Sequence, residues 1–125
     1  MKGYGKIMID GSRVVVEPGP DGQIWLSRYE LADLFGVYTA TITANIKAII
    51  RSGAVKPSLA GTLIQVGKTV LPECYDMEMV IALAFRLNSP AAERMRRCVV
   101  QRIAAGIGKP APTIFLSYGI RTVIN

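Results

Sequence analysis

The side chains best suited to recognising another molecule lie between residues 38 and 45, in the segment YTATITAN. Asparagine can form two hydrogen bonds with adenine, and threonine can donate or accept one while its methyl group contacts that of thymine. A helix that enters the DNA major groove places its N-terminal side chains against base edges. The pattern therefore predicts base contacts from five residues: Tyr38, Thr39, Thr41, Thr43 and Asn45.

Basic side chains surround this segment, and residues 38–56 contain no Asp or Glu. Lysine and arginine contacts to phosphate add salt-dependent affinity without reading the base sequence. We expect phosphate contacts from Arg28, Lys47, Arg51, Lys56 and Lys68. The alternative is a helical hairpin whose only role is packing.

Two short helices would position these side chains. Ser27 and Glu30 have the spacing of a capping box, in which each side chain satisfies a backbone N–H at a helix start. Apolar residues then recur at helical spacing, and Gly36 can adopt the left-handed conformation that ends a helix. The apolar positions are Leu31, Leu34 and Phe35.

The second helix is expected to start with Thr39 or Thr41 as its cap and to end near Ser52–Gly53. Its apolar side carries Ile42, Ile46, Ile49 and Ile50. Two helices joined by a short turn containing glycine are typical of a helix-turn-helix.

Short β-strands flank the helix pair. Residues 6–10 and 13–17 predict a hairpin turning at Gly11–Ser12, and residues 23–26 predict a third strand. Residues 62–66 and 69–74 predict a second hairpin directly after the helix-turn-helix, where a winged-helix domain has its wing. An ordinary hairpin that covers the core fits the same pattern.

Two further helices are expected in the second half. Asp76 would cap a helix that reaches Leu87 and is apolar on almost every side, which requires burial on several sides or at a subunit interface. Ser89 and Pro90 would start the next helix. Its inward positions are Met95, Cys98, Val99 and Ile103, and its arginines, which form either a phosphate patch or a solvated face, are Arg94, Arg96, Arg97 and Arg102.

Charge and composition favour a polyanionic partner over catalysis. The net charge of the 125 residues is +6, divided as −1 over residues 1–46 and +7 over residues 47–125. The chain has no histidine, its acidic residues are scattered, and it has no P-loop or GxGxxG motif. We therefore expect no enzyme activity, no cofactor and no metal, and we expect the two cysteines to fill the core.

No apolar run is long enough to cross a bilayer, and the first residues lack the pattern of a secretory signal. These features predict a cytoplasmic protein that does not enter membranes. We expect one domain over residues 1–109, followed by a β-prone apolar tail over residues 110–125.

Two stretches resemble the N-terminal region of RhuM-like proteins of bacteria and mobile elements. The first joins Trp25-Leu26-Ser27, the segment from Glu30 to Phe35, Ile46-Lys47 and Gly53; the second runs from Tyr75 to Ser89 and reads YDMEMVIALAFRLNS. After Ser89 the family has two aromatic positions, which are here Met95 and Cys98. The resemblance, with its wider relatives among phage antirepressor, KilA-N and BRO-N modules, implies a DNA-binding domain.

Together these features predict an α+β fold containing a winged-helix-like helix-turn-helix. The expected function is sequence-specific binding of double-stranded DNA by a transcriptional regulator of a mobile element or phage-related locus. A homodimer is expected, because such helix pairs usually read two half-sites. The alternative is a protein-interaction or assembly module that uses the apolar helix and tail and binds no nucleic acid.

Overall fold

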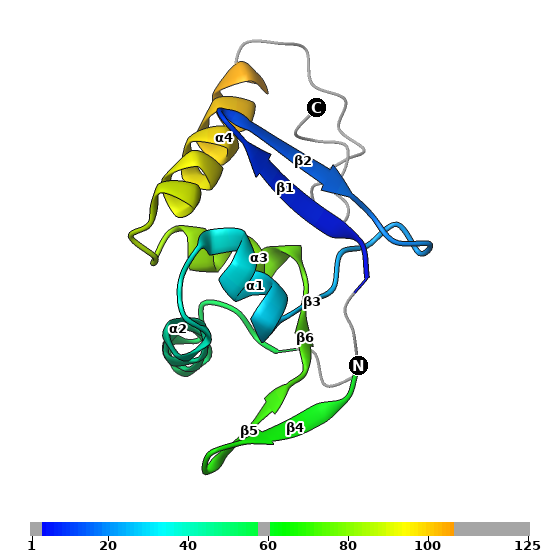
Figure 1. Ribbon diagram of the computed structural model, residues 1–125, viewed down its shortest axis with the longest axis vertical. Coiled ribbons are helices and arrows are strands. Elements are labelled where there is room, and N and C mark those ends of the chain that lie inside the picture. The colour runs from blue at the N-terminus through cyan, green and yellow to red at the C-terminus, as the bar shows by residue number, and fades with distance from the viewer. Residues whose placement is uncertain (1–3, 58–60, 107–125) are drawn as a thin grey trace.

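The computed structural model describes residues 4–57 and 61–106, and this part of the chain combines helices with short antiparallel strands (Figure 1). The predicted α+β class is therefore confirmed. The predicted tail lies outside the described residues. The elements are β1 (Lys6–Asp10), β2 (Arg13–Glu17), β3 (Leu26–Ser27), α1 (Arg28–Phe35), α2 (Thr39–Ser52), β4 (Leu63–Val66), β5 (Thr69–Pro72), β6 (Cys74–Tyr75), α3 (Met77–Ala84) and α4 (Pro90–Gly106).

Three antiparallel strand pairs make up the β structure of the described residues: β1 with β2, β3 with β6, and β4 with β5. The β1–β2 hairpin lies against α4, and the β4–β5 hairpin projects from the opposite end (Figure 1). The first hairpin has the bounds that the sequence predicted, and it turns at Gly11 with a φ of 58°. The third strand is shorter than predicted, because Trp25 only bridges to Tyr4 before β3 begins at Leu26.

Helix α1 forms where the capping box predicted it. The backbone N–H of Ser27 donates to Glu30 Oε1 at 2.9 Å, and the N–H of Glu30 donates to Ser27 Oγ at 3.2 Å. Gly36 ends the helix with a φ of 65°, a value that costs glycine little.

Helix α2 begins without the predicted threonine cap. Tyr38 occupies the N-cap position in an extended conformation, and its carbonyl oxygen accepts from the N–H groups of Thr41 at 2.9 Å and Ile42 at 3.1 Å. The expectation that Thr39 or Thr41 caps this helix is therefore wrong. Tyr38 itself makes no side-chain cap bond.

Helix α3 lies at the centre of the molecule (Figure 1). Its side chains Met79, Val80 and Leu83 are buried in one apolar core, which also contains Phe35 of α1 and Ile46 of α2. Full burial of each such side chain is worth about 1.5–3 kcal/mol. Burial on several sides agrees with the pattern of the sequence.

The ends of α3 and α4 differ in part from the predictions. Asp76 caps α3 as expected, but the helix ends at Ala84 instead of Leu87. Ser89 Oγ accepts from the N–H of Ala92 at 3.1 Å, which confirms the predicted start of α4. Ile103 was expected to face inward, yet it is 55% exposed, because the core reaches only the first half of α4.

Within the part of the chain that the structure describes, no helix is both long and apolar enough to span a membrane.

Candidate nucleic-acid interface

The outer face of α2 is small and polar, as its sequence indicated. Tyr38 stands at the start of the helix with 84% of its surface exposed. Ala40 and Ala44 are exposed, while Thr39 and Thr41 are half-buried at their sides. The first turn carries no acidic side chain, so the partial positive charge of the helix N-terminus is not offset there.

Thr43 and Arg28, predicted as a base contact and a phosphate contact, form one hydrogen-bonded unit. Arg28 Nη1 donates to Thr43 Oγ1 at 2.9 Å, and the Thr43 hydroxyl donates to the carbonyl of Thr39 at 3.0 Å. The Arg28 guanidinium also lies 5.2 Å from the ring centroid of Tyr29. Arg28 is thereby held along the polar side of α2, and Thr43 is engaged within the protein.

Asn45 is engaged in a similar way. Its Nδ2 donates to the carbonyl of Thr41 at 2.8 Å, and its Oδ1 accepts from Arg86 Nε at 3.2 Å. An arginine whose Nε is used in this way keeps its two terminal amino groups as donors. The amide of Asn45 therefore orients the exposed Arg86 side chain.

Arg86 was not among the residues that the sequence predicted for this site. It is 41 residues away from Asn45 in the chain, so no local spacing connects the two. Arg86 belongs to the segment FRLNS, which resembles RhuM-like proteins, but that resemblance did not predict a contact between Arg86 and α2.

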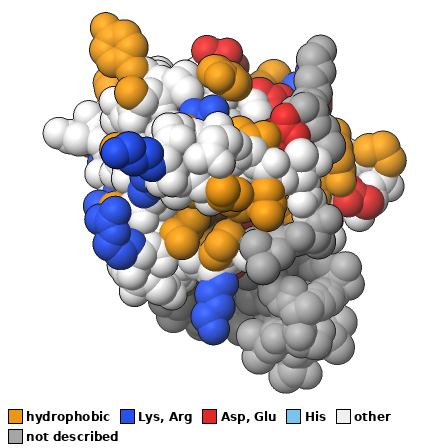
Figure 2. Space-filling model, turned by 90° about the horizontal axis from the view of Figure 1, so that it is seen from below, with side chains coloured by type: hydrophobic (Ala, Val, Ile, Leu, Met, Phe, Trp, Pro, Cys, Tyr) orange, Lys and Arg blue, Asp and Glu red, His pale blue; other side chains and the backbone are white. Residues whose placement is uncertain are grey.

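The remaining predicted phosphate contacts divide between α2 and the second hairpin. Lys47 and Arg51 border a hollow of about 450 Å³ between α2 and β4–β5. Lys68 is exposed at the hairpin turn, and Lys56 is exposed between the helix and the hairpin. Seen from the end of the molecule that carries this hairpin, hydrophobic side chains gather near the middle, and basic side chains lie to their left and below them (Figure 2).

Two of the four arginines of α4, Arg96 and Arg97, make polar contacts within the protein. Arg96 was expected to point away, but its Nη1 donates to the carbonyls of Ala84 at 2.6 Å and Leu87 at 2.7 Å. Arg97 lies 3.8 Å from Glu93 in an exposed ion pair. Arg96 therefore secures the end of α3, and the phosphate-patch interpretation of this helix loses its central member.

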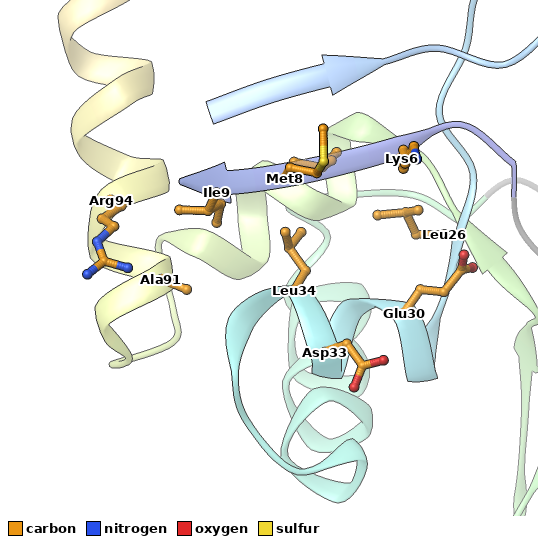
Figure 3. Close-up of a pocket in the computed structure, with 10 residues that line it drawn as sticks. Lys6, Met8, Ile9, Leu26, Glu30, Asp33, Leu34, Ala91 and Arg94 are labelled. Carbon is orange, nitrogen blue, oxygen red and sulfur yellow. The ribbon is translucent and has the colours of Figure 1, made fainter. Parts of the chain in front are cut away.

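A second hollow, of about 460 Å³, lies between β1, α1 and α4. Figure 3 shows Arg94 at one end of it and Glu30 at the other, with Leu34 and Ile9 between them and Asp33 nearby. Both signs of charge line this hollow, and Glu30 already serves the cap of α1. This mixture of charges does not favour the binding of a polyanion.

Two ionisable groups near the start of α3 have raised pKa values. Burial raises the pKa of Tyr75 to about 12, and its hydroxyl has no hydrogen-bond partner among the described protein atoms. Burial, followed by the nearby Glu73 carboxylate, raises the pKa of the Cys74 thiol. A buried thiol with a raised pKa is a poor nucleophile, in keeping with a core role.

Comparisons with known protein families, curated protein sequences and solved structures found no match to this chain.

Proposed function

We propose that the chain binds double-stranded DNA sequence-specifically, with α2 in the major groove. The observation that carries the proposal is the attachment of two arginines, Arg28 and Arg86, to the polar side of α2 through Thr43 and Asn45. Arg28 belongs to α1 and Arg86 follows α3, so the folded protein concentrates positive charge beside a helix face that carries no acid. Arginine is the commonest reader of guanine in the major groove.

The roles of the predicted site residues follow from their contacts. Tyr38, Thr39 and Thr41 would meet base edges at the start of α2. Thr43 and Asn45 would act chiefly by holding Arg28 and Arg86, since their own polar atoms are engaged. This assignment replaces direct base contacts at positions 43 and 45 with contacts from the arginines that they orient.

The β4–β5 hairpin would serve as the wing of a winged-helix arrangement. It follows α2 in the chain, carries Lys68 at its turn and projects from the body of the molecule (Figure 1). Lys47, Arg51, Lys56 and Lys68 would then contact phosphates. We further propose a homodimer on two half-sites and, from the resemblance to RhuM-like proteins, regulation of a mobile element or phage-related locus.

A second candidate is a protein-interaction module, and one observation favours it. Leu63 and Val70 of the second hairpin are 45% and 55% exposed, beside the hollow next to α2. Exposed apolar patches often mark protein contacts.

Selection from a pool of random DNA duplexes tests the first candidate against the second. DNA binding predicts an enriched motif, and a duplex with that motif should outcompete a scrambled duplex in a gel shift. An interaction module predicts no enrichment, together with a defined oligomer by light scattering in the absence of DNA. Failure to enrich any sequence, despite folded protein, would overturn the proposal.

A further inference from the structure

The hollow between α2 and the second hairpin, which we call the α2–hairpin groove, has the size of a small-molecule site. Its volume is about 450 Å³, and ligand pockets in proteins range over roughly 300–1,000 Å³. Its lining includes Lys47, Ile50 and Arg51 of α2, and Leu63 and Val70 of the hairpin.

The groove is apolar over most of its wall. Of its apolar lining residues, Leu71 is buried and Ile50 is half-buried, while Leu63 and Val70 are largely exposed to solvent. Covering such side chains with an apolar ligand removes their surface from water, which is worth about 25 cal/mol per Å².

The charged groups of the groove all have one sign. Lys47 and Arg51 lie one turn apart on α2, and none of the described residues that line the groove is Asp or Glu. The second hollow differs, because it mixes Lys6 and Arg94 with Glu30 and Asp33. The α2–hairpin groove therefore favours an apolar ligand that carries negative charge.

We propose that the α2–hairpin groove binds a small amphipathic anion. Its carboxylate or phosphate head pairs with Lys47 and Arg51, and its apolar body lies against Ile50, Leu63 and Val70. Binding of the anion does not require DNA. Under the proposed DNA-binding function, an occupied groove withdraws Lys47 and Arg51 from the phosphate backbone, so the anion acts as a competitor of DNA.

Titration of the isotopically labelled full chain with octanoate, octyl phosphate and octanol tests this site by nuclear magnetic resonance. We expect saturable shifts centred on Ile50, Leu63 and Val70 for both anions. We expect octanol to bind about tenfold more weakly, since two exposed ion pairs each contribute modestly. Comparison of octanoate with octyl phosphate shows which head group is preferred.

Three variants locate the ligand. The double variant Lys47→Ala/Arg51→Ala should weaken octanoate about tenfold and leave octanol unchanged. Val70→Asp should weaken all three ligands, because a carboxylate then enters the apolar part of the groove, and it should weaken the two anions most, because it also repels their head groups. Lys68→Ala is the matched control, since Lys68 belongs to the same hairpin but not to the lining, and it should bind octanoate as the unaltered chain does.

The site is overturned if both anions give no saturable shifts, if octanol binds as tightly as octanoate, or if the shifts fall outside the groove. Competition with DNA is measured separately, by adding octanoate to a preformed DNA complex. Anion binding without release of DNA would leave the groove established and would contradict only its link to the proposed function.

Discussion

Arg86 donates its Nε–H to Asn45 Oδ1 across 3.2 Å, which joins the segment after α3 to the polar side of α2. Asn45 in turn donates to the carbonyl of Thr41 within α2. Asn45, which the sequence predicts to contact bases directly, instead orients the side chain of Arg86. The placement of Arg86 depends on the packing of α3 against α2, so the site exists only in the folded protein.

Replacement of Arg86 by Ala should weaken specific DNA binding by about 1–3 kcal/mol, the range for a lost bidentate base contact. Asn45→Ala should have a similar effect, because it releases the guanidinium. The double variant should cost clearly less than the sum of the two single variants, and a double-mutant cycle by fluorescence anisotropy measures this coupling. Additive effects would show that the two residues act separately.

Thr41→Ala and Arg51→Ala should differ in kind. Thr41 lies near the start of α2, where a base contact is expected, so its loss should change the preferred base at one position of the site. Arg51 lies in the last turn, where loss of a phosphate contact weakens binding to all sequences alike. Binding to a panel of single-base variants of the duplex separates the two results, and an unchanged profile for Thr41→Ala would remove Thr41 from the interface.

Arg96→Ala should destabilise the fold by about 1.5–3 kcal/mol, since hydrogen bonds from charged groups are worth that much. The substitution leaves the carbonyls of Ala84 and Leu87 without their arginine donor. Arg97→Ala is the matched control, because its exposed ion pair with Glu93 should contribute less than about 1 kcal/mol. Urea unfolding measures both, and equal effects would contradict the structural role of Arg96.

Tyr75→Phe should cost little stability near neutral pH, because the hydroxyl has no partner among the described protein atoms. The folded-state pKa of Tyr75 is raised from 10.0 to about 12, so the unfolded chain loses the phenolic proton first. The effect of Tyr75 ionisation on the free energy of unfolding is therefore absent below pH 10, and it lowers that free energy as the pH rises toward 12. The free energy of unfolding of the unaltered chain, measured with urea, should therefore fall relative to that of Tyr75→Phe across that window, and a constant difference would show that the pKa is not raised.

Local signals in the sequence were sufficient for much of the fold. The β1–β2 hairpin and the capping box of Ser27 and Glu30 depend on residues a few positions apart, and both formed where predicted. The start of α2 was harder to predict, because Thr39 and Thr41 were chosen for their capping side chains, whereas the residue at the N-cap makes no side-chain cap bond. The backbone there placed the cap at Tyr38.

Contacts between distant segments were beyond local patterns. Helical spacing placed Ile103 on the same face as Met95, but it carries no information on where the covering layer ends. The same applies to Arg96, whose carbonyl partners belong to the end of another helix. At the candidate interface, the sequence was sufficient to predict the small polar face of α2. The hydrogen bonds from Arg28 to Thr43 and from Arg86 to Asn45 became visible only in the folded structure.

The central claim is tested most directly by the salt dependence of DNA binding. The affinity of the unaltered chain for its selected duplex should fall steeply with rising salt, with a slope of log K against log salt that reflects the number of phosphates contacted. Lys47→Ala and Arg51→Ala should each reduce the magnitude of that slope by about one. A chain that fails to bind duplex DNA at low salt, or whose binding does not change with salt, would contradict the assignment of α2 and its flanking basic residues as a DNA-binding surface.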